Sequence, residues 1–341
     1  MPDPTYSFVI PIYDEVTCLP ELVRRLTDVM AQLDGSSEVL LVDDGSRDGS
    51  YALMLEANQR DFRFKVIQLS RNFGHQMAIT AGLDLARGRA VVVMDGDLQD
   101  PPEVVLEMAK RWREGYEVVH AVRGQREGES AMKRLTASWY YALLGKLTDV
   151  DAAGNVGDFR LVDRRALDAF NHMREHNRYI RGMFAWVGFR QTGVAYPRAA
   201  RHSGTTKYPF RKMLRFGMDG IVSFSSVPLR VALRIGFVLA VLSILGGLTA
   251  IMLHLVGDLE VPGWTSLIFA VSFLGGVQLL TLGMMGEYIS RIHDEVRGRP
   301  LYFVRETHGI TEPSGIANEP SLQVTPGELD PPGGIRSMPP R

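Results

Sequence analysis

The chain has 341 residues, one cysteine and a formal net charge of -1. This length suits one large domain or two small ones, and the balanced charge argues against nucleic acid as a partner. A lone Cys18 cannot form an internal disulfide, so the composition gives no sign of an oxidising compartment. The N-terminal residues lack the basic segment and long apolar run of a signal peptide, and we expect them to form a strand.

Short apolar runs alternate with amphipathic stretches over the first third of the chain. The expected strands are 7–11, 38–42, 64–69, 90–94 and 117–122, and the expected helices are 18–33, 49–60, 75–87 and 101–113. This alternation is typical of a Rossmann-like α/β fold, with a mostly parallel sheet covered by helices on both faces. Ligands of such sheets bind beyond the carboxyl ends of the strands.

Candidate ligand-binding residues lie at the ends of the first four of these runs, where a ligand would bind. They include Pro11, Tyr13, Glu15, Asp43, Asp44, Arg71, Asp95, Asp97 and Gln99. Asp95 and Asp97 flank a glycine, so both carboxylates can turn toward one point and bind Mg²⁺ or Mn²⁺ together with a diphosphate. The alternative is a set of solvated loop acids, and Asp100 before two prolines fits a helix N-cap.

The C-terminal third contains two apolar stretches, 235–256 and 264–288, each long enough to cross a bilayer. Arginines flank their outer ends and none lies in the linker, so the positive-inside rule places both large ends of the chain in the cytosol. A buried helical hairpin is the alternative. The remaining expected parts are a catalytic domain over 1–200, a basic amphipathic segment over 201–234, a return segment over 289–310 with a strand within 299–306, and a disordered tail over 311–341.

Four stretches together carry a family resemblance. They are FVIPIYDE, LLVDDGSRDGS, LSRNFGHQMAITAGLDLARG and VVVMDGDLQDPPE, in this order. In order and spacing they resemble glycosyltransferase family 2, whose nucleotide-sugar-binding fold is called GT-A. The pattern RNFGHQ…DLQDPPE followed by two apolar stretches is similar to the polyprenyl-phosphate glycosyltransferases, among them the dolichol-phosphate mannose and undecaprenyl-phosphate glucose enzymes. The resemblance extends over about residues 5–305.

The resemblance implies a role for each matched residue. The implied nucleotide-sugar-binding residues are Pro11, Tyr13, Glu15, Asp43, Asp44, Arg71, Asp95 and Gln99. Asp97 is the implied catalytic metal ligand, with Asp95 beside it. Asp158 is implied to lie at the reacting centre, as a base or as an orienting group. We favour orientation, because a phosphate monoester, with a second pKa of about 6, is already largely ionised at neutral pH.

An acceptor phosphate at a membrane surface calls for arginine and lysine near the apolar stretches. Arg123 and Arg126 lie in one basic stretch. Arg201, also a candidate catalytic residue, and Lys207 lie in a second, which resembles the family pattern R-x-x-G-x-[ST]-K-Y. Ordinary charge flanking a membrane span is the alternative for the second stretch.

The resemblance thus implies an inverting, metal-dependent hexosyltransferase that uses UDP-glucose, or alternatively GDP-mannose, and a polyprenyl phosphate. We expect a homo-oligomeric, multi-pass protein of the cell membrane with a cytosolic catalytic domain. A processive polysaccharide synthase shares the fold but carries a Q-x-x-R-W motif, which is not found here. An inactive nucleotide-sugar-binding scaffold would have lost the carboxylates, and an NAD-binding protein would show G-x-G-x-x-G after the first strand.

Overall fold

The structure, a computed structural model, describes residues 3–123, 156–196 and 263–310, with scattered positions between 234 and 252. The chain divides into two units, Met1–Gly309 and Ile310–Arg341. The first unit holds every element described below. The expected basic segment 201–234 up to residue 233, most of the first apolar stretch and the tail 311–341 lie outside the described residues.

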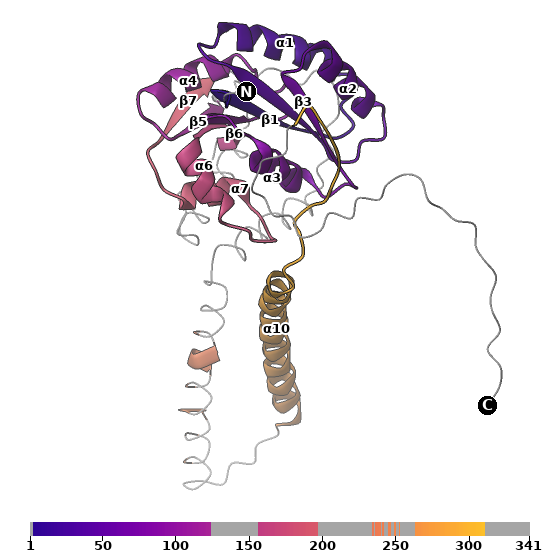
Figure 1. Ribbon diagram of the computed structural model, residues 1–341. Helices are drawn as coiled ribbons and strands as arrows, with labels where there is room; N and C mark the ends of the chain where they lie inside the picture. The colour runs from indigo at the N-terminus through magenta and orange to yellow at the C-terminus, as the bar shows by residue number, and fades with distance from the viewer. Residues whose placement is uncertain are drawn as a thin grey trace, which may run out of the picture. The chain divides into compact units, whose positions relative to one another are not determined.

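An eight-stranded sheet in the order β7-β5-β6-β4-β1-β2-β3-β8 forms the centre of the described fold (Figure 1). The strands are β1 Tyr6–Ile12, β2 Ser37–Asp43, β3 Phe64–Leu69, β4 Ala90–Val93, β5 Val118–Arg123, β6 Val156–Asp163, β7 Gln191–Tyr196 and β8 Val304–His308. Only β6 and β8 run antiparallel to their neighbours in this sheet. The predicted α/β class with a mostly parallel sheet is confirmed, and the carboxyl ends of β1 to β4 share one edge.

Helices cover both faces of the sheet. They are α1 Leu19–Gln32, α2 Ser50–Arg60, α3 His75–Leu85, α4 Val104–Arg113, α6 Arg164–Asn171 and α7 Ile180–Trp186, with α10 Trp264–Val296 following. Figure 1 shows α1, α2 and α4 on one side of the sheet and α3, α6 and α7 on the other. The fourth predicted helix starts later than expected, at Val104, and Asp100 instead accepts a hydrogen bond from the Tyr196 hydroxyl. The N-cap interpretation of Asp100 is therefore wrong.

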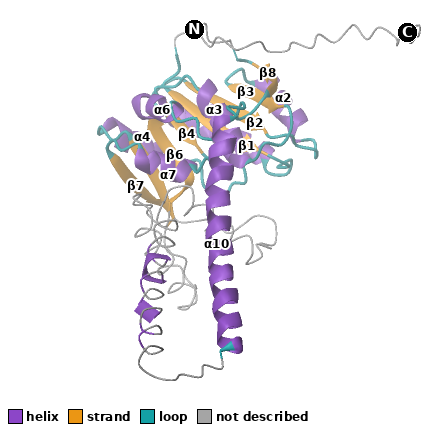
Figure 2. Cartoon of the chain, turned by 90° about the horizontal axis from the view of Figure 1, so that it is seen from below, coloured by secondary structure: helices purple, strands orange, loops and turns teal. Residues whose placement is uncertain are grey.

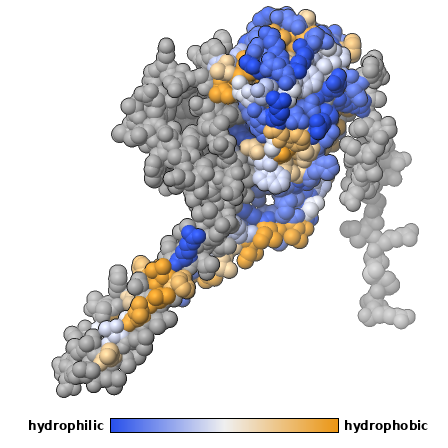
Figure 3. Space-filling model, turned by 90° about the vertical axis from the view of Figure 1, so that its left-hand side faces the viewer, coloured by the Kyte–Doolittle hydropathy of each residue, from blue (hydrophilic) through white to orange (hydrophobic). Residues whose placement is uncertain are grey.

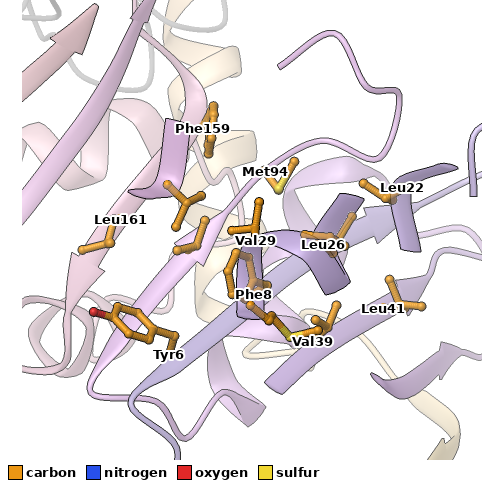
Figure 4. Packing of buried hydrophobic residues seen from close by; sticks show 14 of the residues in the cluster. Tyr6, Phe8, Leu22, Leu26, Val29, Val39, Leu41, Met94, Phe159 and Leu161 are labelled. Carbon is orange, nitrogen blue, oxygen red and sulfur yellow. The ribbon is translucent and has the colours of Figure 1, made fainter. Parts of the chain in front are cut away.

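The two periodicities of the sequence build the core. Leu22, Leu26 and Val29 recur at helical spacing on α1 and pack with Phe8 and other alternate residues of the strands (Figure 4). Each fully buried side chain of this kind contributes about 1.5–3 kcal/mol. On the opposite face, α3 approaches β1 so closely that a Cβ at Gly82 would lie 2.3 Å from the Val9 side chain.

The predicted second membrane span, 264–288, lies on the 33-residue helix α10. Within the described ranges, none of the helices combines the length and apolar character needed to cross a membrane. Large apolar side chains of α10 are exposed, among them Leu267, Val271 and Leu279. On the face drawn in Figure 3, hydrophobic residues gather along the elongated part that extends from the rounded sheet domain. The surface of the sheet domain itself is mostly hydrophilic on this face.

The return segment after α10 rejoins the sheet. It forms a strand, as expected, but at Val304–His308, later than the expected 299–306: β8 pairs antiparallel with β3 and extends the sheet at that edge (Figure 2). The tyrosine hydroxyl of Tyr51 on α2 donates to Glu306 at 3.0 Å and lies 3.1 Å from the His308 ring nitrogen. Thus the end of the described chain is fixed beside α2 and the start of β3.

Candidate active site

A pocket of about 340 Å³ opens at the carboxyl ends of β1, β2 and β4. It is lined by Pro11, Ile12, Tyr13, Glu15, Asp44, Asn72, Gly74, His75, Ala78, Asp95, Gly96 and Asp97. Five of the eight residues predicted to bind the nucleotide sugar are among these, and so is the predicted metal ligand Asp97. Asp43, Arg71 and Gln99, which were predicted with them, are not. The expectation that ligands bind beyond the carboxyl ends of the strands therefore predicts where the pocket lies. It does not distinguish residues that line the pocket from residues that support it.

Asp95 follows the buried strand β4, and its carboxylate is poorly compensated. Its Oδ1 atom is buried and has no hydrogen-bond partner among the described residues. The nearest cationic group is the His75 Nε2 atom, 3.4 Å away. Burial raises the pKa of Asp95 to about 6, and the neighbouring acids add to the shift. A bound cation would relieve this unfavourable burial of a carboxylate.

The turn that contains Asp97 fixes the orientation of its carboxylate. Its Oδ1 accepts a hydrogen bond from the Gln99 backbone at 3.0 Å, and its Oδ2 accepts one from the Gln99 side-chain amide. Leu98 between them has φ 58°, a conformation that is uncommon for a bulky side chain. At Gly96 a Cβ would lie 2.6 Å from the end of the Ile12 side chain, which would have to shift to make room for it. Gln99 thus orients Asp97 and does not line the pocket.

The residues present fit a divalent cation that is shared with a substrate. No group of three histidine, cysteine, aspartate or glutamate side chains in the described part of the chain could hold a metal alone. Mg²⁺ is commonly bound through one or two carboxylates plus substrate phosphates. Asp95 and Asp97 supply such a pair. Burial and the charge of Asp97 also raise the pKa of Glu15, and a cation between these acids would counter that shift.

Asp44 and Asp43 tie the second strand to neighbouring loops. Asp44 accepts hydrogen bonds from the backbone of Phe73 at 2.7 Å and of Gly74 at 3.0 Å. Burial raises the pKa of Asp44, although these two bonds act in the opposite direction. Asp43 is fully buried and accepts from the Ser46 backbone at 3.0 Å. Asp44 therefore shapes the pocket wall, and Asp43 holds the turn behind it.

Asp158 lies in a cluster of cationic side chains. Arg181 donates to both of its carboxylate oxygens at 2.9 Å, and Arg160 and His75 approach to 3.7 and 3.5 Å. Burial alone would raise the pKa of Asp158, but the hydrogen bonds from His75 and Arg181 and the charges of Arg181 and Arg160 hold it far below its usual range. A carboxylate stabilised in this way is a weak base, which favours the orienting role.

Two residues of this cluster were missed from the sequence as site residues. Burial lowers the pKa of His75, but its hydrogen bond to Asp158 and the charges of Asp95 and Asp158 outweigh that effect, so the pKa is raised. The motif RNFGHQ already contained His75 as a signal. Arg181 reaches the site from α7, far along the chain, and no strand-end pattern indicates it.

The remaining predicted residues do not line the pocket or lie outside the described residues. The Arg71 guanidinium stacks on the Phe73 ring at 4.0 Å and donates to the Asn72 carbonyl. Arg123 ends β5 opposite Tyr196 of β7. Three predicted acceptor residues lie outside the described residues: Arg126, Arg201 and Lys207.

Comparison with known proteins identifies the class. The family model described as Glycosyl transferase family 2 matches residues 7–170. The chain is 48% identical over 305 residues to the uncharacterized glycosyltransferase YkcC of Bacillus subtilis (strain 168), covering 89% of this chain and 94% of that one. It is 36% identical over 302 residues to the SfII prophage-derived bactoprenol glucosyl transferase of Shigella flexneri, covering 89% and 98%. The chain therefore belongs to glycosyltransferase family 2 and is a glycosyltransferase.

A more distant likeness exists among solved structures. Glucosyl-3-phosphoglycerate synthase from Mycobacterium tuberculosis, in complex with Mn²⁺, uridine diphosphate and glucosyl-3-phosphoglycerate, is 16% identical, with a TM-score of 0.43. The match covers 64% of this chain and 78% of that one. A likeness at this level carries no inference about substrate or metal.

Proposed function

We propose that the protein transfers a hexose from a nucleoside-diphosphate sugar, UDP-glucose in the first instance, to a polyprenyl phosphate such as undecaprenyl phosphate. The observation that carries this proposal is the pair Asp95 and Asp97 at the mouth of the pocket, next to the Asp158–Arg181 pair. The name of the Shigella relative, a bactoprenol glucosyl transferase, supports both the sugar and the lipid.

The reaction we propose is a single displacement. Tyr13 and Asp44 line the space for the nucleotide, and Asp95 and Asp97 would hold Mg²⁺ or Mn²⁺. The ion would neutralise charge on the departing diphosphate. An oxygen of the acceptor phosphate attacks the anomeric carbon, the bond from that carbon to the diphosphate oxygen breaks, and the anomeric configuration inverts. Asp158 keeps Arg181 oriented at the reacting centre and need not remove a proton.

We propose a membrane location to match the lipid acceptor. The length of the two apolar stretches, 235–256 and 264–288, and the arginines that flank them support two spans with a cytosolic catalytic domain. On this proposal the protein is a multi-pass homo-oligomer of the cell membrane. Arg123, Arg126, Arg201 and Lys207 would bind the lipid phosphate on the cytosolic side.

A donor panel tests the proposed function. Full-length protein in detergent would receive UDP-glucose, GDP-mannose, UDP-galactose or UDP-N-acetylglucosamine, each with and without a short polyprenyl phosphate. We expect nucleotide release that depends on the lipid, and we expect it from UDP-glucose. If the lipid stimulates nucleotide release from GDP-mannose alone, the donor is GDP-mannose and not UDP-glucose. Sugar binding without release from any donor would favour the scaffold interpretation.

Removal of divalent metal should stop transfer. Chelation with EDTA is expected to lower the rate by at least about 10²-fold, because the diphosphate would leave without charge neutralisation. Rates would be measured before chelation, after it, and after Mg²⁺ or Mn²⁺ is added back. Full activity in EDTA would contradict the assignment of Asp95 and Asp97 as metal ligands.

The acceptor residues should affect the lipid more than the sugar. Arg201→Ala and Lys207→Ala are each expected to raise the KM for the polyprenyl phosphate about tenfold, since a charge-assisted hydrogen bond is worth about 1.5–3 kcal/mol. The KM for the nucleotide sugar should change little. Lys110→Ala, on the exposed surface of α4, is the matched control. If the KM for the nucleotide sugar rises more than the KM for the polyprenyl phosphate, these residues belong to the donor site.

A further inference from the structure

The loop that follows β3 forms one wall of the donor pocket through Asn72 and Gly74. One side of this loop is held by Asp44, which accepts the backbone hydrogen bonds of Phe73 and Gly74. The approach is close, because a Cβ at Gly45 would lie 2.9 Å from the Asn72 nitrogen. The pocket wall therefore depends on what fixes the loop from its other side.

That other side is held by the return segment after α10. The backbone of Ser70, the first residue of the loop, donates to the Phe303 carbonyl at 2.9 Å. The ring of Phe303 packs against the ring of Phe73, with centroids 6.3 Å apart and a tilt of 49°. Phe73 thus donates its backbone hydrogen bond to a residue of the pocket while its side chain contacts the return segment.

The return segment is itself firmly attached to the catalytic domain. β8 continues the sheet beside β3, and the Tyr302 hydroxyl donates to Asp84 of α3 at 2.8 Å. Arg174 binds the same carboxylate of Asp84 at 2.8 Å. Closer to α10, His176 contacts Glu295 and Arg299. Phe303 is therefore presented from a rigid support and not from a free chain end.

We propose that Phe303 is a positioning residue for donor binding: through Phe73 it fixes the loop 70–74 in the arrangement that the nucleotide sugar requires. The inference rests on the proposed function, since it assumes that this pocket takes the nucleotide sugar. Phe303 does not line the pocket and acts through the loop alone. Its ring is 55% exposed, so its packing contributes little to the core as a whole.

The test compares variants of the full-length protein in detergent. Phe303→Ala should raise the KM for UDP-glucose and weaken the binding of UDP about three- to tenfold, the scale of an aromatic pair, with kcat within about twofold of the wild type. Phe303→Tyr keeps the ring and should restore both values. Phe62→Ala is the matched control, because Phe62 is exposed and lies outside the pocket.

The outcomes separate the two claims. UDP affinity and KM that stay at wild-type values in Phe303→Ala, with only a lower melting temperature, would overturn the inference and leave the proposed function intact. If the alanine variant does not fold, the same two values, the KM for UDP-glucose and the affinity for UDP, are compared in Phe303→Leu, which removes the ring but keeps most of the apolar volume. Wild-type protein that binds neither UDP nor GDP would overturn the proposed donor site itself, and with it this inference.

Discussion

Replacing Asp97 with asparagine should reduce transfer by about 10²-fold or more, with the fold unchanged. The substitution removes one of two carboxylates that would hold the cation at the diphosphate, and loss of such stabilisation costs about 10²–10³ in kcat or more. The asparagine side chain has the same size and can still accept the hydrogen bond that the Gln99 backbone gives to Asp97. Structure and melting temperature should therefore remain close to those of the wild type.

The measurement is the initial rate of lipid-dependent nucleotide release at saturating donor and Mg²⁺. Asp28→Asn, an exposed acid on α1, is the matched control and should keep full activity. A variant Asp97→Asn that turns over normally would remove Asp97 from the metal site. A variant that loses activity together with its melting transition would show instead that the turn 96–99 needs the carboxylate to fold.

Replacing Asp158 with asparagine should have a different result, in which stability and activity both fall. Asp158 is 3% exposed and compensates Arg160, which is fully buried. Its removal leaves a buried cation without its partner, at a cost of about 2–3 kcal/mol. Arg181 also loses both of its carboxylate hydrogen bonds and its orientation, so we expect kcat to fall about 10²-fold.

Chemical unfolding and initial rates measure the two effects separately. Asp168→Asn is the matched control, since that acid of α6 is exposed and forms only a surface ion pair. Arg181→Lys should retain the positive charge but lose the two-point contact with Asp158. We therefore expect its kcat to fall about as far as that of Asp158→Asn, with a smaller loss of stability. An Asp158→Asn variant with wild-type kcat would contradict the orienting role.

The pH dependence follows from the lowered pKa of Asp158. A carboxylate whose pKa is lower in the folded chain than in the unfolded chain stabilises the fold fully above the unfolded value of about 3.9. That contribution is lost as the pH falls below this value toward the folded pKa. The difference in unfolding free energy between wild type and Asp158→Asn should thus be largest near neutral pH and shrink below about pH 4. A difference that grows with acid would contradict the assignment.

The main features of the site could be predicted because they follow from local patterns. Asp95 and Asp97 come directly after a buried strand, and parallel strands bring their carboxyl ends to one edge. The stretch 299–306 likewise predicted a strand packed against the catalytic domain, although β8 begins only at Val304. Each of these predictions needs only the strand pattern and the direction of the sheet.

Contacts between distant segments could not be predicted in this way. Arg181 on α7 contacts Asp158 on β6, and Phe303 after α10 contacts Phe73 after β3. Hydrophobic periodicity locates elements but does not state which charged side chains face each other. Gln99 shows a related limit, because its position after the strand predicts proximity to the pocket, whereas its hydrogen bonds to Asp97 determine its role.

The most direct test of the central claim is the mass of the lipid after reaction. Full-length protein would be incubated with UDP-glucose, undecaprenyl phosphate and Mg²⁺, with Asp97→Asn in parallel, and the lipid analysed by mass spectrometry. The account predicts a lipid phosphate heavier by one anhydrohexose in the wild-type reaction and absent from the variant. UDP release with an unmodified lipid would contradict it.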